Sequence, residues 1–148
     1  MEKKQGLGMS PRPSSEHQMA ILVLMHQINA TYCFKNIVAT PEEELYGPNS
    51  RTPDITIWTL NKNGNKHHPV LTIEIVKDKR SFNYSYQSIM EVFEKCKTVK
   101  MSYIYNYKTD TWYEVHRDGE VYEGECFSEL LGMNMKLTTI LYKQLSKK

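Results

Sequence analysis

The sequence predicts an α/β fold with a central mixed β-sheet flanked by helices. Apolar residues recur with helical spacing over 15–29, and a helical period returns from about residue 83. Between them, 70–76 is a nearly continuous run of apolar and β-branched residues. Such a run is typical of a central strand buried on both faces. Helices and strands in this order favour a layered sheet-and-helix architecture.

The chain has 148 residues, of which 40% are hydrophobic and 24% charged. This length suits one domain with a buried core, and this composition is ordinary for a soluble globular protein. A net charge of +2 requires no strongly basic nucleic-acid-binding face. We expect residues 1–14, which carry lysine, glycine and proline, to form a flexible tail, and 15–148 to form a single domain.

Three widely spaced cysteines, Cys33, Cys96 and Cys126, form no CxxC motif. They argue against a disulfide framework and a zinc ribbon, and they indicate a reducing compartment. No apolar run reaches membrane-spanning length, and the N-terminus lacks the layout of a secretory signal. We therefore expect a cytoplasmic protein of bacterial type.

The first predicted helix begins at Ser15, with Gln18 at the spacing of a capping box. Asn29 is the predicted stop. So much apolar surface predicts a helix that is covered on most sides. Its expected inward stripe is Ile21, Leu24, Met25 and Ile28.

The remaining segments predict strands joined by turns. We expect strands at 34–40, 54–60, 70–76, 101–107 and 111–116, with a turn-rich connection over 61–68. Asp118-Gly119 is the strongest hairpin signal in the chain. A short strand through Met133, Met135 and Leu137 and a last helical turn close the chain.

Two acidic residues stand at neighbouring predicted strands. Pro53-Asp54 heads one strand, and Glu74 lies inside the next. Adjacent strands would place both carboxylates at one edge of the sheet. Two hard oxygen ligands, completed by water and a phosphate oxygen, form an ordinary Mg²⁺ environment. A metal held there can polarise a phosphate and lower the pKa of an attacking water.

Each acid also has a structural interpretation. Glu74 could be a strand residue paired with Lys77 or Arg80 at the rim of the sheet. Pro-Asp before a strand is common turn chemistry. However, an isolated charge within an apolar strand is costly, so Glu74 needs a metal, a cation or an exposed cleft. Taken together, the two acids favour a site.

Several segments resemble one known family. The sequence TPDITI at 52–57, followed by PVLTIEIV at 69–76, resembles the Uma-two family of proposed restriction endonucleases within the PD-(D/E)xK nuclease superfamily. SEHQ at 15–18, YIYN at 103–106 and LLGM at 130–133 extend the similarity over about 15–141, and their order and spacing carry it. The resemblance implies a restriction-endonuclease-like fold, a Mg²⁺ or Mn²⁺ cofactor, and nucleic acid (first of all DNA) as partner. Many such nucleases pair to cut two strands, so both a homodimer and a monomer stay open.

By this resemblance, Asp54 and Glu74 would be the metal ligands. The superfamily's lysine two residues after the glutamate is replaced here by Val76. Uma-two proteins often carry that lysine on the following helix, but the simplest alignment places Ile89 or Met90 there. The usual cation is therefore missing from both positions.

Lys77 and Gln87 are the remaining candidates for the residue that orients water. A cation matters because negative charge gathers on the phosphate in the transition state. Glutamine could orient water but could not neutralise that charge, and Gln87 could equally be a solvated helix residue. In the first helix, His17 could face the cleft or simply pack, and Glu16 could assist a metal or complement the helix dipole.

Two functions remain open on the sequence. The first is a metal-dependent endonuclease in which Asp54 and Glu74 bind the ion and Lys77 or Gln87 positions water. The second is a catalytically degenerate protein of the same fold that binds nucleic acid or a protein partner without cutting. The acidic pair favours the first function, and Val76 favours the second.

Overall fold

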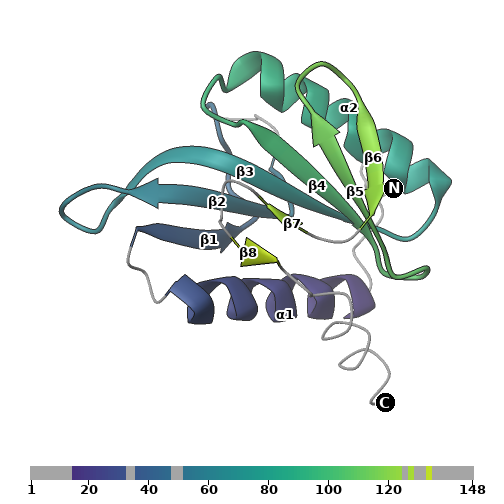
Figure 1. Ribbon diagram of the computed structural model, residues 1–148, viewed down its shortest axis with the longest axis horizontal. Coiled ribbons are helices and arrows are strands. Elements are labelled where there is room, and N and C mark those ends of the chain that lie inside the picture. The colour runs from purple at the N-terminus through teal and green to yellow at the C-terminus, as the bar shows by residue number, and fades with distance from the viewer. Residues whose placement is uncertain (1–14, 33–35, 48–51, 125–126, 129–132, 135–148) are drawn as a thin grey trace, which may run out of the picture.

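The structure, a computed structural model, describes residues 15–32, 36–47, 52–124, 127–128 and 133–134. A six-stranded mixed sheet lies between two helices, which confirms the predicted fold class (Figure 1). The helices are α1 (Ser15–Tyr32) and α2 (Lys79–Lys95). The sheet runs in the order β1 (Ile37–Pro41), β2 (Ile55–Leu60), β3 (Lys66–Val76), β4 (Met101–Asn106), β5 (Thr111–His116), β6 (Val121–Gly124). A separate pair is formed by β7 (Phe127–Ser128) and β8 (Met133–Asn134).

The sheet contains one parallel pair, β3 with β4, which α2 connects. Its other neighbouring strands are antiparallel. The turn between β2 and β3 is shorter than predicted, because β3 begins at Lys66 and pairs with Leu60. Gly119 has a φ of 91°, a conformation that favours glycine, in the predicted hairpin between β5 and β6.

Strand β3 is central and buried on both faces, as its composition predicts. On one face Ile73 and Ile75 pack in the core that α1 covers. On the other face Val76 packs with Ile104 and the apolar side of α2. The sheet is therefore the middle layer of three, and the ends of its strands are left as the places where polar side chains can gather.

Helix α1 extends past its predicted stop at Asn29 to Tyr32. Asn29 does not end the helix. Its side chain bonds the edge strand β1: Nδ2 donates to the Ala39 carbonyl (3.2 Å), and Oδ1 accepts from the Ala39 N–H (2.8 Å). The expected coverage of α1 is also incomplete, because Leu22 is 61% exposed and Met19 is exposed as well.

Replacing Asn29 with alanine is expected to destabilise the protein by about 1–3 kcal/mol, the usual cost of leaving a buried backbone group without a partner. Ala39 is 2% exposed, so water cannot readily replace the lost bonds. Urea denaturation followed by circular dichroism measures the change. His26→Ala, at an exposed position of the same helix, is the control and should shift stability by less than about 0.5 kcal/mol. Equal stability of the two variants would contradict this role of Asn29.

Helix α2 begins at Lys79, earlier than the predicted start near residue 83. Asp78 caps it: its side chain accepts from the Ser81 N–H, and the Ser81 hydroxyl accepts from the Asp78 N–H. The pKa of Asp78 lies below its usual value, and the largest cause is the hydrogen bond that the Ser81 N–H donates to its carboxylate. The first turn of α2 thus depends on capping rather than on apolar periodicity.

Some predictions fall wholly or partly outside the described residues. These are the tail at 1–14, the start of the strand at 34–40, the part of the last strand at Met135 and Leu137, and the last helical turn. Among the described cysteines, Cys96 is free and buried, and burial raises the pKa of its thiol. Neither of the two described helices is both long and apolar enough to cross a membrane.

Candidate metal and nucleic-acid site

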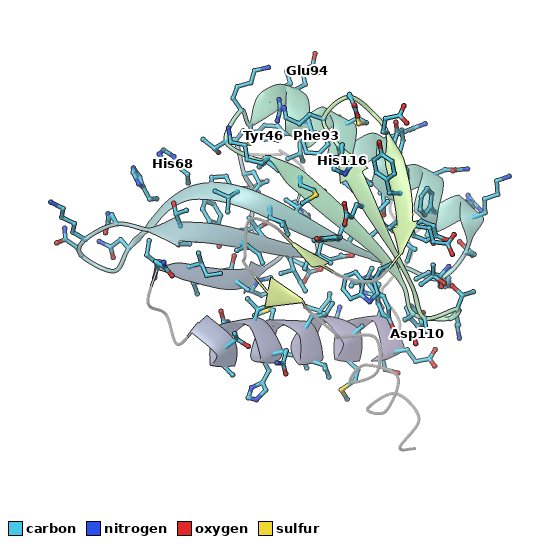
Figure 2. All side chains as sticks on the ribbon, viewed as in Figure 1. Tyr46, His68, Phe93, Glu94, Asp110 and His116 are labelled. Atoms are coloured by element: carbon cyan, nitrogen blue, oxygen red, sulfur yellow. The ribbon has the colours of Figure 1, made fainter. Side chains whose placement is uncertain are left out.

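Several elements converge at one end of the sheet. The parallel strands β3 and β4 end there, and because β2 is antiparallel to β3, β2 starts there. Helix α1 also begins at this end, on the right of the view in Figure 1. In Figure 2, Asp110 marks this end, whereas His68 lies at the opposite one. The carboxyl ends of parallel strands are the usual location of ligand sites in α/β folds.

Asp54 and Glu74 both lie at this end. The outermost pair of the β2–β3 ladder there is Ile55 with Ile73, and Asp54 and Glu74 are the next residues outward on their strands. The strand order predicted from the sequence therefore brings the two acids to the same edge.

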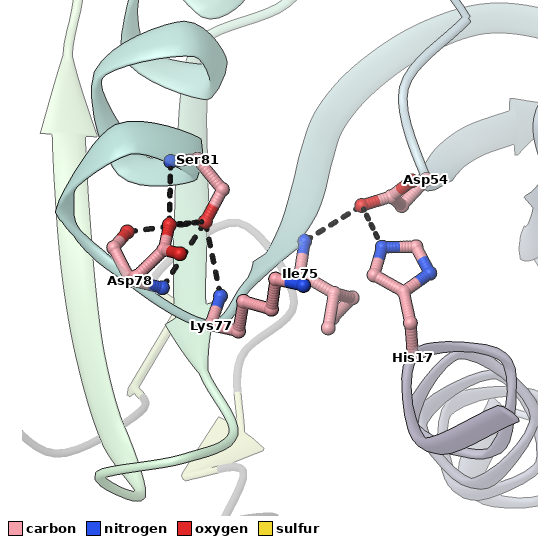
Figure 3. Close-up of polar contacts among 6 residues, drawn as sticks. All are labelled: His17, Asp54, Ile75, Lys77, Asp78 and Ser81. Carbon is pink, nitrogen blue, oxygen red and sulfur yellow. Dashed lines mark hydrogen bonds and ion pairs between the residues drawn. The ribbon is translucent and has the colours of Figure 1, made fainter. Parts of the chain in front are cut away.

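The contacts of Asp54 are unequal between its two carboxylate oxygens. Oδ2 accepts a hydrogen bond from the Ile75 N–H (2.7 Å) and lies 3.2 Å from His17 Nε2, as Figure 3 shows. Because an ionised carboxylate only accepts, His17 must donate through Nε2. Within the described part of the chain, Oδ1 makes no hydrogen bond. One oxygen is thus held by the protein, and the other remains available to a ligand.

His17 comes from the first turn of α1 and is largely shielded, with 16% of its side chain exposed. Burial lowers the pKa of its imidazole, but the hydrogen bond and the charge of Asp54 outweigh burial, and the net pKa lies above its usual value. The charge of Glu42 acts in the same direction. From the sequence, His17 could either face the cleft or simply pack. In the structure it contacts Asp54.

Glu74 is 9% exposed and lies on the central strand β3, opposite Ile104 of β4. Its neighbours along β3, Ile73 and Ile75, face α1, so Glu74 faces the side that α2 covers. Thr72 lies two residues before Glu74 on the same face of β3, and its strand partners are Thr56 on β2 and Ser102 on β4. All three hydroxyl side chains are buried. Polar groups near a buried carboxylate lower the cost of its charge.

The candidate cations and water-orienting residues lie at different places. Val76, at the position of the superfamily lysine, is 1% exposed and packs against α2. Lys77 is exposed directly after β3, and Figure 3 shows its side chain extending back toward Ile75. Gln87 lies on the exposed side of α2 and makes no hydrogen bond with Asp54. Lys77, and not Gln87, therefore lies at the end of the sheet that carries Asp54.

The donor chemistry fits a hard divalent cation. Two carboxylates offer oxygen ligands, and magnesium commonly binds through one or two carboxylates while it keeps several waters. Among the residues that the structure describes, no group of three or more His, Cys, Asp and Glu could hold a metal. The described residues thus offer no closed zinc-type site, which would need four protein ligands.

An open depression of about 470 Å³ lies elsewhere, lined by Met90, Glu91, Phe93, Glu94 and Arg117. Phe93 and Glu94 lie near the C-terminal end of α2, far from Asp110 in Figure 2. The guanidinium of Arg117 already donates hydrogen bonds there, to the carbonyls of Phe93 and Val99. Neither Asp54 nor Glu74 lines this depression, so the candidate site lies at the other end of the sheet.

Comparison with known proteins supports the architecture. The fold is similar to the crystal structure of a candidate nuclease belonging to DUF820 from Anabaena variabilis ATCC 29413, with a TM-score of 0.68 and 15% sequence identity over 91% of this chain and 84% of that chain. No family model matches the sequence. No curated protein matches it either. At this identity, the similarity establishes a shared fold.

Proposed function

We propose that the protein is a metal-dependent nuclease that hydrolyses phosphodiester bonds in DNA. One observation carries the proposal: Asp54 and Glu74 lie at the same end of adjacent strands, and Asp54 keeps one carboxylate oxygen free of hydrogen bonds within the described residues. The likeness of the fold to a candidate nuclease supports it.

In this proposal, Asp54 through Oδ1 and Glu74 through its carboxylate hold one Mg²⁺ or Mn²⁺ ion. The bound ion would polarise a phosphate oxygen and lower the pKa of a water molecule. Lys77 would neutralise negative charge on the scissile phosphate, a role that the buried Val76 cannot fill. The exposed cations Lys79 and Arg80 follow directly and would attract the phosphate backbone.

The test uses the purified full chain with supercoiled plasmid DNA and, separately, an RNA transcript. Cleavage of DNA is expected with Mg²⁺ or Mn²⁺ and is expected to stop when EDTA removes the ion. Intact DNA and RNA with both ions would rule out the enzyme. Cleavage of RNA alone would overturn the assignment of DNA.

One observation favours a second function, nucleic-acid binding without cleavage. The position at which the superfamily has a lysine is occupied by Val76, whose side chain is buried in the apolar core. It predicts a gel shift of DNA without product in the same samples. The shift should weaken with salt and in Lys79→Glu and Arg80→Glu proteins, since phosphate contacts depend on released counterions.

A further inference from the structure

Asp54 is held by donors from two different elements. The Ile75 N–H belongs to β3 (2.7 Å), and His17 Nε2 belongs to α1 (3.2 Å), and both reach the same oxygen, Oδ2. We propose that His17 is a positioning residue that fixes the plane of the Asp54 carboxylate and so directs Oδ1 toward the metal. This inference rests on the proposed function and assigns a task to a side chain outside the pair of ligands.

A second donor is needed for a geometric reason. The terminal torsion of aspartate is broad, so one hydrogen bond from Ile75 leaves the carboxylate able to turn about its last bond. A donor from another direction restricts that rotation. Only 16% of each of the two side chains, His17 and Asp54, is exposed, so water competes weakly for the bond.

The loss of a positioning residue lowers metal affinity by a characteristic factor. Carboxylates that bind metals are themselves usually hydrogen-bonded, and loss of such an outer partner typically lowers metal affinity about 10–100-fold. The effect acts on binding of the ion itself, so it can be measured without substrate and without catalysis.

His17 is separable from the docking of α1. The first turn of α1 has another polar contact at this end of the sheet, between Glu16 and Lys108 Nζ (3.1 Å). The helix is also held by buried apolar residues, among them Ile21 and Leu24. Removal of the imidazole should therefore leave α1 in place while it releases Asp54.

The experiment measures Mn²⁺ affinity by electron paramagnetic resonance of the free ion, together with the melting temperature of each protein. His17→Ala is expected to bind Mn²⁺ about 10–100-fold more weakly than wild type. His17→Gln keeps an N–H donor at a similar reach and is expected to recover most of the affinity. Lys108→Ala, which breaks the other contact of the same helical turn, should change the affinity less than about fivefold, the equivalent of the roughly 1 kcal/mol that an exposed ion pair contributes at most.

The outcomes separate this inference from the proposed function. Wild-type affinity in folded His17→Ala would overturn the positioning role and leave the nuclease proposal intact. Weak binding by a folded His17→Gln protein would also overturn it, because a direct metal ligand rather than a hydrogen-bond donor would then be missing. Absence of Mn²⁺ binding by wild type would remove the metal site, and with it both proposals.

Discussion

Glu74→Gln is expected to abolish metal-dependent DNA cleavage. The amide keeps the size of the side chain but replaces a charged oxygen ligand by a neutral one. A bound metal contributes several kcal/mol of charge stabilisation in the transition state. Because about 1.4 kcal/mol corresponds to a tenfold change in rate, the loss should be at least about a hundred-fold. Single-turnover cleavage of plasmid DNA in saturating Mg²⁺ measures it.

Glu114→Gln is the matched control. Glu114 also lies on a strand of the sheet, β5, but its carboxylate contacts His116 rather than the end of β3. Strand β5 is separated from β3 by β4, so the same change of charge there should leave cleavage within about fivefold of wild type, the equivalent of about 1 kcal/mol. A Glu74→Gln protein that cuts at the wild-type rate would show that this carboxylate is not a metal ligand.

The architecture could be predicted because its main signals are local. The apolar run in β3 is long enough to fill both faces of a central strand, and Leu71 to Val76 are indeed buried. The Asp118-Gly119 turn needs a positive φ, which glycine adopts at little cost, and the hairpin forms there. In both cases, the residues that determine the structure are adjacent in the chain.

The end of α1 and the start of α2 were predicted wrongly, whereas α1 starts at Ser15 as predicted. The two errors arose because polar residues near helix ends serve several purposes. Asn29 suits a helix stop, but its partner is the backbone of Ala39, which only the tertiary fold brings near. Asp78 and Ser81 form a capping box, a polar signal that is independent of apolar periodicity. Polar residues near helix ends therefore need the identity of their partners before they can be interpreted.

The sequence could predict that Asp54 and Glu74 lie at one edge of the sheet. It could not predict the contact of His17 with Asp54. The order of the strands sufficed to bring Asp54 and Glu74 to one edge. His17 lies 37 positions from Asp54, and their contact depends on where α1 packs on the sheet. The roles of these residues in binding and catalysis stay predictions until the variants are measured.

The largest loss of stability is expected for Trp112→Ala. Trp112 is 1% exposed and lies in the core that α1 covers. Its ring packs edge-on against Tyr103 at 5.9 Å between centroids and lies 4.6 Å from Tyr105. Truncation of a buried tryptophan costs about 3–5 kcal/mol. Against a typical total of about 5–15 kcal/mol for a domain, this should lower the urea midpoint greatly or unfold the protein.

Trp112→Phe separates the packing of this ring from its polar group. Within the described residues, the buried indole N–H of Trp112 has no hydrogen-bond partner. A buried donor without a partner costs about 1–3 kcal/mol, and phenylalanine removes that donor while it retains an aromatic ring. The phenylalanine protein should therefore lose less than about half as much stability as the alanine protein. Equal losses would indicate that the indole N–H is satisfied, for instance by an ordered water molecule, and that its hydrogen bond stabilises the core.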